Sequence, residues 1–471
     1  MVLPKIIQGG MGVGVSGWRL ARAVSALGQL GVVSGTALDQ VFARRLQDGD
    51  PGGHCRRALS HFPFPLLALR VWDRFYIDGG KAPDQPYIRM PLHTKDNPQE
   101  LQELCIAANF VEVFLSKEGH HNPVGINYLE KIQVPHLPSI YGALLAGVDA
   151  VLMGAGIPLR LPGTLDRLAL HQETTYPLYV IGAGPEDDTL MHFDPRQFAE
   201  SELPPLHRPL CLPIIASNTL AVTLVKKSNG RVDGFIVEGP TAGGHNAPPR
   251  GKMQLDGNGE PIYGDRDVVD LAKLRELGLP FWLAGGYGSS QKLADALAAG
   301  AAGIQVGTAF AFCQESALLE EYKRTVLSDQ PKLKTDPLAS PTGFPFKVLQ
   351  LQNTVADSST YSARPRICDL GYLREAYRAA DGEIGYRCAG EPVTQFVAKG
   401  GKPEDAAGRM CLCNGLMANI GHGQVRAAGR LHEPGLITAG DDVGDVSRFL
   451  KPGQSSYTAA DVIHALLAPP E

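Results

Sequence analysis

The sequence lacks the features that mark membrane, secreted and nucleic-acid-binding proteins. No run of about 18 apolar residues predicts a transmembrane helix, and the start, MVLPKIIQGGMG, has neither the basic nor the apolar segment of a signal peptide. The chain has 44 Lys and Arg against 49 Asp and Glu, and it contains no basic run dense enough for a nucleic-acid face. We therefore expect a cytoplasmic protein that binds neither a membrane nor a nucleic acid.

Cysteine is scarce and irregularly spaced. Eight cysteines in 471 residues do not make a disulfide framework, and they fit a reducing compartment. Four of them raise the question of a metal or iron–sulfur site: Cys368, Cys388, Cys411 and Cys413. Because they lack the paired C-x2-C arrangement that such sites usually show, the sequence favours buried free thiols and predicts no metal ligand.

Short apolar strands alternate with helical segments along most of the chain. Helical spacing of apolar residues, as in 18–27, follows most of the strands. Eight alternating units predict a closed (β/α)8 barrel of the α/β class, a TIM barrel. The predicted strands begin at Lys5, Gly31, Pro123, Asp149, Leu212, Asp233, Pro280 and Gly303.

Two insertions and a long C-terminal segment interrupt or follow this alternation. Residues 48–97 are rich in Pro, Gly, His and aromatic residues, so we expect little regular structure there. Residues 185–209, with many prolines and acids, are predicted to be a second insertion. We expect residues 1–327 to form the barrel, and residues 328–471 to form a cap region that packs on it and has a helix near 406–418.

The stretch 232–251, VDGFIVEGPTAGGHNAPPRG, is predicted to contain an active-site loop. It begins as a buried parallel strand that ends in the carboxylate of Glu238. No bulky side chain follows until His245, and adjacent glycines let the backbone approach a flat ligand. Barrels of this kind carry their chemistry on the loops after the strands, so His245 is a candidate catalytic residue. The alternative is a glycine-rich turn whose histidine caps a neighbouring backbone group.

Two glycine turns after the last two strands are suited to binding phosphate. Gly285, Gly286 and Gly288 precede a helix, so their amides can bind an anion. Gly307 and Thr308 add an amide and a hydroxyl, and TIM barrels commonly bind phosphate at these two positions. Tight packing between strand and helix also explains glycines in either turn taken singly.

Five motifs, in this order, resemble the nitronate monooxygenase family, formerly called 2-nitropropane dioxygenases: IIQGGMG, GINY, VEGPTAGGH, LAGGYG and QVGT. The resemblance covers roughly residues 4–327 and implies an FMN-dependent TIM-barrel flavoprotein with His245 as the catalytic residue. It also implies the cofactor-binding residues Gly10, Met11, Asn127, Ser217, Glu238, Gly243, Gly244, Ala284, Gly285, Gly286, Gln305, Gly307 and Thr308.

One departure from the family concerns charge near the cofactor. Where many members carry a basic residue after the fifth strand, this chain reads Ala216-Ser217-Asn218. Arg250, in the loop after His245, is a candidate substrate-binding residue for an anion, with a solvent-facing role as the alternative.

The function that the resemblance implies is oxidation of alkyl nitronates by molecular oxygen, an oxidoreductase and monooxygenase activity. The partners are then a nitronate or nitroalkane and oxygen, with a homodimer as one candidate assembly. A flavin-dependent enoyl-thioester reductase of fatty-acid or polyketide type is the alternative enzyme. The third hypothesis is a non-catalytic flavin-binding protein. Such a protein would have no use for an imidazole beside the flavin.

Overall fold

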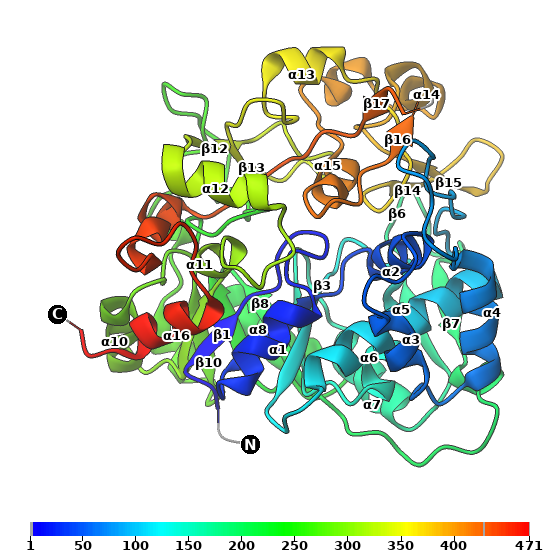
Figure 1. The fold of residues 1–471 in the computed structure, drawn as a ribbon, viewed down its shortest axis with the longest axis horizontal. Coiled ribbons are helices and arrows are strands. Elements are labelled where there is room, and N and C mark those ends of the chain that lie inside the picture. The colour runs from blue at the N-terminus through cyan, green and yellow to red at the C-terminus, as the bar shows by residue number, and fades with distance from the viewer. Residues whose placement is uncertain (1–2, 427–428, 471) are drawn as a thin grey trace.

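The centre of the molecule is a closed barrel of eight parallel strands surrounded by helices, as Figure 1 shows. The computed structural model describes residues 3–426 and 429–470. Strands that follow one another along the chain are neighbours in the barrel, and the last closes on the first, with Ile6 opposite Ile304. The predicted TIM barrel is confirmed, and its eight strands are β1 (Ile6–Gln8), β2 (Leu30–Ser34), β3 (Val124–Leu129), β4 (Ala150–Gly154), β8 (Leu210–Ile215), β9 (Phe235–Glu238), β10 (Phe281–Ala284) and β11 (Gly303–Val306).

The barrel strands are apolar on both faces because both faces are covered. Alternate residues point inward and fill the barrel with one cluster that includes Ile7, Leu152 and Trp282. The residues between them, such as Ile6 and Val151, pack under the surrounding helices. A strand buried in this way reads as a near-continuous apolar run, which is why the sequence located these strands.

The helices of the repeating units follow the strands. The most buried is α5, which packs against α1, α2 and α6. Side-chain caps begin α8 at Ser217, α9 at Asp270 and α10 at Ser289, where each side chain accepts a backbone N–H. The helices are α1 (Trp18–Ala26), α2 (Leu38–Gln47), α5 (Gln99–Lys117), α6 (His136–Leu145), α7 (Leu161–Ala169), α8 (Asn218–Lys227), η2 (Asp265–Asp267), α9 (Leu271–Arg275), α10 (Ser290–Ala298) and α11 (Thr308–Ala311).

The expectation of little regular structure in residues 48–97 is wrong for its first half. Two helices form there, α3 (His54–Leu59) and α4 (Pro65–Phe75). Pro65 occupies the first helical position, where its fixed φ favours the turn, so this proline begins a helix. The second insertion contains β7 (Leu190–Phe193), which pairs antiparallel with β5 (Thr174–Pro177), and the short helix η1 (Pro195–Gln197).

Residues 328–471 lie mainly above the barrel in Figure 1, in yellow to red. Their strand β14 pairs with β6 (Val180–Ile181) of the barrel part, and α16 packs against α1, α10 and α11. The boundary at residue 327 stays a prediction. The elements are α12 (Glu320–Asp329), β12 (Leu333–Asp336), β13 (Phe346–Leu349), α13 (Ser358–Ala363), β14 (Glu375–Arg378), β15 (Ile384–Arg387), α14 (Val393–Ala398), η3 (Pro403–Ala406), α15 (Leu412–Ala418), β16 (Val425–Arg426), β17 (Leu431–His432), η4 (Asp441–Phe449) and α16 (Ala459–Leu467).

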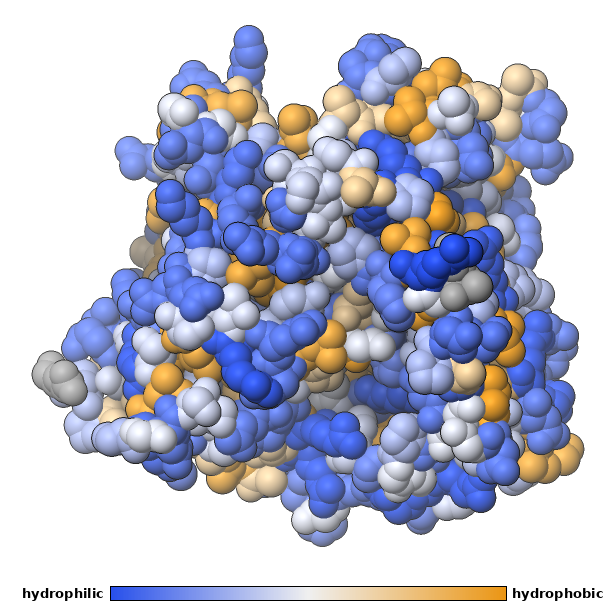
Figure 2. Space-filling view, turned by 45° about the horizontal axis from the view of Figure 1, so that its top comes forward, coloured by the Kyte–Doolittle hydropathy of each residue, from blue (hydrophilic) through white to orange (hydrophobic). Residues whose placement is uncertain are grey.

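The surface is mostly polar on the face that Figure 2 shows, with small hydrophobic patches dispersed among hydrophilic residues. Among the described residues, none of the helices combines the length and the apolar character that crossing a membrane requires.

Candidate functional site

A cavity of about 630 Å³ opens at the carboxyl ends of the barrel strands, between the barrel and the C-terminal extension. Its volume lies within the range usual for small-molecule and cofactor sites. All the site residues predicted from the sequence except Gly288 line this one cavity: Gly10, Met11, Asn127, Ser217, Glu238, Gly243, Gly244, His245, Arg250, Ala284, Gly285, Gly286, Gln305, Gly307 and Thr308.

His245 faces the cavity from the loop after β9. Its Nε2 lies 2.7 Å from the hydroxyl oxygen of Ser340, which lies 2.8 Å from that of Thr342. The ring of Phe346 packs edge-on against the imidazole, with 4.8 Å between the ring centroids. Burial, with a smaller contribution from Lys131, lowers the pKa of His245 to about 4. At neutral pH the imidazole is therefore uncharged and held in place at Nε2.

The C-terminal extension builds part of this site, which sequence reasoning missed. The backbone N–H of Asn246 donates to the carbonyl of Pro345 (2.9 Å), and Lys347 N–H donates to Gly244 O (3.0 Å). The amide of Gly244 donates to the hydroxyl of Thr438 (2.8 Å). The loop that carries His245 is thus fixed by two segments roughly a hundred and two hundred residues further along the chain. No local pattern in the sequence signals such distant pairings.

Next to β1 and β3, the wall of the cavity can fit closely against a flat ligand. A Cβ added to Gly10 would lie 2.5 Å from the Cβ of Asn127, so only glycine fits beside this asparagine. The Asn127 amide makes one long contact, 3.4 Å from Nδ2 to the carbonyl of Tyr128. The Oε1 of Gln305 is buried and has no hydrogen-bond partner in the protein. Buried polar atoms are usually paired, so a ligand that offers a donor at this place fits the site.

Glu238 ends β9 inside the same cavity. Burial raises the pKa of this carboxyl to about 7. Its raised pKa follows from the loss of hydration, because a charged carboxylate is disfavoured away from water. A proton on Glu238 makes it a donor to a ligand, whereas the ionised form accepts only.

The glycine turn after β10 has the backbone of an anion site. Gly285 and Gly286 have φ angles of 88° and 69°, which glycine adopts without strain. In the described part of the chain, the amides of Gly285, Gly286 and Gly288 have no acceptor within the protein. They lie just before α10, whose N-terminus favours negative charge.

The turn after β11, at Gly307 and Thr308, differs from the expectation because the Thr308 hydroxyl already has hydrogen-bond partners in the protein. This hydroxyl accepts the N–H of Gly440 (2.9 Å) and interacts with the carboxylate of Asp442. One oxygen of that carboxylate is buried without a partner, and burial raises the pKa of Asp442. The other would lie 2.9 Å from a Cβ on Gly288, so an acid stands beside the predicted phosphate turn.

Two predicted residues have structural roles besides lining the cavity. The hydroxyl of Ser217 accepts the N–H of Leu220 (3.2 Å) and so caps α8. The side chain of Arg250 is exposed, and one guanidinium nitrogen lies 3.4 Å from the carbonyl of Ala216. Arg250 therefore reaches the turn Ala216-Ser217-Asn218, where the resemblance led us to expect a basic residue that this chain lacks.

The residues present fit a flavin on three observations. Glycines leave room for a flat ring against Asn127, Gln305 offers an unpaired buried oxygen, and the turn after β10 presents free amides for a phosphate. Asp442 is the feature that opposes a phosphate at this turn while it is ionised.

Comparisons with known proteins address the family. Residues 192–348 match the family model described as nitronate monooxygenase. A nitronate monooxygenase from Paraburkholderia phytofirmans is 31% identical over 182 residues, which are 37% of this chain and 46% of that protein. The chain thus spans less than half the length of this relative. The resemblance seen in the sequence is confirmed by these two matches.

Two solved structures are similar over nearly the whole chain, at low identity. FabK from Thermotoga maritima has a TM-score of 0.47 and 15% identity, covering 99% of this chain and 92% of that one. A nitroalkane oxidase from Streptomyces ansochromogenes has a TM-score of 0.45 and 16% identity, covering 98% and 94%.

Proposed function

We propose that this chain, whose residues 192–348 match the family model described as nitronate monooxygenase, is an FMN-dependent oxidoreductase that oxidises alkyl nitronates with molecular oxygen. The observation that carries the proposal is the placement of the predicted site residues. They come from six of the eight barrel strands and the turns after them, and all of them except Gly288 line one cavity with His245.

The roles of the residues follow from their surroundings. Asn127, Gln305 and Glu238 bind the flavin ring, and the amides of Gly285 and Gly286 bind its phosphate. When bound, the flavin supplies the electron-transfer chemistry, and the protein positions the reactants. The part of the cavity that the extension lines, near Phe344 and Leu373, would be left for the substrate.

His245 is the residue assigned to proton transfer. Ser340 holds its Nε2, which leaves Nδ1 as the nitrogen that accepts a proton from the carbon of a neutral nitroalkane. A nitronate has already lost this proton, so for that substrate the imidazole only orients the anion. Arg250, whose guanidinium is at the cavity rim, attracts the anion.

The experiment compares two reactions of the purified, FMN-loaded protein. One assay measures oxygen uptake with propionate 3-nitronate, and the other measures NADPH oxidation with a short enoyl thioester in the absence of oxygen. We expect oxygen uptake and no NADPH oxidation. Turnover of the thioester alone would replace the proposal with the reductase reading, and turnover of neither would favour a non-catalytic flavin protein.

The variant His245→Gln tests the assignment of the base. We expect it to retain FMN, seen by absorbance, and to lose about 100-fold or more of kcat on a neutral nitroalkane. The loss on the preformed nitronate should be smaller because no carbon proton is removed. Thr342→Val is the matched control, since this residue touches Ser340 and not the imidazole. Equal activity of His245→Gln and the wild type on both substrates would remove His245 from the mechanism.

A further inference from the structure

Four cysteines that are far apart in the sequence converge in the C-terminal extension. A Cβ added to Gly390 would lie 3.6 Å from Cys388 Sγ and 3.3 Å from the carbonyl of Met410, the neighbour of Cys411. All four are free and wholly or largely buried: Cys368, Cys388, Cys411 and Cys413. Burial raises the pKa of each thiol, and neighbouring cysteines raise it further for three of them, to about 12 for Cys368. Four thiols gathered without disulfides are an arrangement that a thiophilic metal stabilises.

Hydrogen bonds tie together the segments that carry these cysteines. The guanidinium of Arg366 donates to the carbonyls of Glu391 (3.0 Å) and Ala389, which binds the segment before Cys368 to the loop after Cys388. The same group donates to Ala406 O (3.0 Å), close in sequence to Cys411. These bonds hold the convergence in place independently of the thiols themselves.

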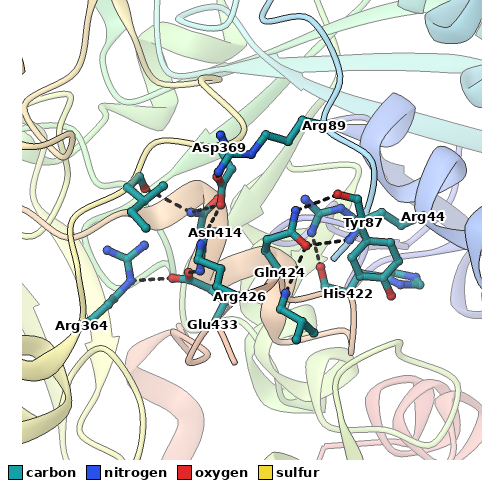
Figure 3. A network of polar contacts seen from close by, with 12 residues as sticks. Arg44, Tyr87, Arg89, Arg364, Asp369, Asn414, His422, Gln424, Arg426 and Glu433 are labelled. Atoms are coloured by element: carbon teal, nitrogen blue, oxygen red, sulfur yellow. Dashed lines mark hydrogen bonds and ion pairs between the residues drawn. The ribbon is translucent and has the colours of Figure 1, made fainter. Parts of the chain in front are cut away.

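A second tie joins the segment of Cys368 to the helix that contains Cys413. The amide of Asn414, in α15, donates to the carboxylate of Asp369 (3.2 Å) and to the carbonyl of Ile367 (3.3 Å), as drawn in Figure 3. Asp369 and Asn414 are the residues next to Cys368 and Cys413. The buried pair Arg364 and Glu433 (2.5 Å) lies in the same network, and Arg364 also interacts with the Cys411 thiol.

Backbone amides lie beside each of the four sulfurs. The N–H of Gly390 donates to Cys388 Sγ (3.4 Å). The other three sulfurs also have backbone amide partners: Gly371 at Cys368, Asn414 at Cys411, and Tyr372 and Leu373 at Cys413. Hydrogen bonds to cysteine sulfur are one of the means by which proteins tune iron–sulfur clusters.

The spacing of the sulfurs distinguishes a cluster from a single ion. Tetrahedral zinc with bonds of about 2.3 Å places its sulfurs roughly 3.8 Å apart. Within the described residues, only Asp39, His93 and Cys105 bring three potential ligand atoms within 4.8 Å of one another. No three of the four sulfurs lie within 4.8 Å of one another, so they are spread more widely than around one zinc ion and leave room for a larger core.

We propose that Cys368, Cys388, Cys411 and Cys413 bind a [4Fe–4S] cluster, one thiolate to each iron. Each thiol gives up its proton to solvent as its iron–sulfur bond forms, and two ferrous ions, two ferric ions and four sulfide ions are taken from outside the protein, so the core forms in its 2+ state without net electron transfer. The four ligands come from three separate segments, and only Cys411 and Cys413 are near neighbours in the sequence. The C-x2-C pattern is therefore absent. This assignment replaces the sequence-based preference for unliganded thiols.

The proposed cluster borders the cavity described above. Cys413 lines that cavity, as do Leu412, Tyr372 and Leu373 beside it. The site nevertheless stands on the cysteines alone, and it does not rest on the proposed nitronate activity. The two proposals therefore fail separately, because one is read from metal content and the other from turnover.

The experiment measures iron and acid-labile sulfide in the full-length protein after anaerobic reconstitution with sulfide and equal amounts of ferrous and ferric iron. We expect about four of each per chain and an EPR signal after reduction. Cys388→Ser and Cys411→Ser should lose most of the iron, whereas Cys55→Ser, which alters a buried thiol in α3 outside the cluster, should keep it. FMN binding is measured in parallel by absorbance as a check of folding.

Three results would overturn the assignment. The wild type could remain free of iron and sulfide although it binds FMN, or a single zinc ion could bind in place of iron. The cysteine-to-serine variants could also keep the full iron content while folded. If these variants do not fold, the iron, sulfide and EPR measurements on the wild type decide by themselves.

Discussion

Asp442 places a carboxylate beside the turn that is proposed to bind phosphate. One of its oxygens would lie 2.9 Å from a Cβ on Gly288, and the other is buried without a partner. A phosphate bound at this turn and the ionised carboxylate would repel each other, so Asp442→Asn should tighten FMN binding at pH 8 by roughly tenfold, or about 1.4 kcal/mol. Fluorescence titration of the flavin-free protein measures the Kd.

Asp445→Asn is the matched control for Asp442→Asn. It removes the same charge three residues away, but its side chain is largely exposed, and water and salt screen exposed charges. We expect its Kd to equal that of the wild type. An Asp442→Asn protein with unchanged affinity would place the phosphate elsewhere.

Glu238 makes the stability of the flavin-free protein depend on pH. Burial raises its pKa from 4.5 to about 7 in the folded state, so the folded protein binds this proton more tightly than the unfolded chain does. Stability from this group is full below about pH 4.5 and is lost as the pH rises through 7. Between pH 5 and pH 8, Glu238 should lower the unfolding free energy of the wild type by up to about 3 kcal/mol. Glu238→Gln should not show this decrease.

Urea unfolding of the wild type and Glu238→Gln at pH 5 and pH 8 measures this effect. The difference in unfolding free energy between the two proteins should favour the variant more at pH 8 than at pH 5. The same difference at both pH values would mean that Glu238 is ionised throughout.

At the scale of the element, the turn after β10 tolerates no side chain at its first glycine. A Cβ on Gly285 would lie 2.9 Å from Thr241 Oγ1 and 3.0 Å from the amide nitrogen of Ala242, at a φ of 88°. Gly285→Ala should therefore displace the loop that leads to His245 and weaken FMN binding at least tenfold. Gly278→Ala adds the same methyl at a φ of 69° with nothing within 4 Å, so it isolates backbone strain. Equal FMN affinity in the two variants would contradict this account.

Strand β13 supports the loop that carries His245 through Phe346. This ring is 2% exposed and packs on the imidazole of His245. Phe346→Ala should lower the free energy of unfolding by about 3 to 5 kcal/mol, because it leaves a cavity in the core. It should also reduce kcat, since the imidazole loses the contact that orients it.

Leu338→Ala serves as the control for Phe346→Ala. Leu338 lies on the same segment but is 51% exposed, so its removal should change the free energy of unfolding by about 0.5 kcal/mol or less. Denaturant unfolding and steady-state kinetics measure both variants. A stable Phe346→Ala protein with full kcat would show that β13 does not position His245.

The features that could be predicted from the sequence are those that local sequence patterns encode. Each barrel strand is a short apolar run, and the site residues stand directly after such runs, so their meeting in one cavity follows from the closure of the barrel. The contacts of His245 with Ser340 and Phe346 join positions about a hundred residues apart, and nothing in either segment specifies the other. The four cysteines are likewise far apart in the sequence. Hydrogen bonds from Arg366 and Asn414 hold their segments together in the fold.

At the scale of the whole molecule, the barrel and the C-terminal extension share the site, so a bound flavin should stabilise both. Gly440 N–H donates to the hydroxyl of Thr308, and the N–H of Asp441 donates to the carbonyl of Thr241 (3.0 Å). FMN at 100 times its Kd should add about 2.7 kcal/mol of stability. Local unfolding of residues 285–288 and of residues 438–442 should then become rarer.

Hydrogen exchange with and without FMN, read by mass spectrometry of peptides, measures this coupling. We expect slower exchange in peptides from both segments, and unchanged exchange in α4, which lies in the first insertion and lines no part of the cavity. Protection confined to 285–288 would mean that the extension covers the site without responding to the ligand. Protection of both segments, lost in Gly285→Ala but not in Gly278→Ala, would show that the turn after β10 carries the coupling between them.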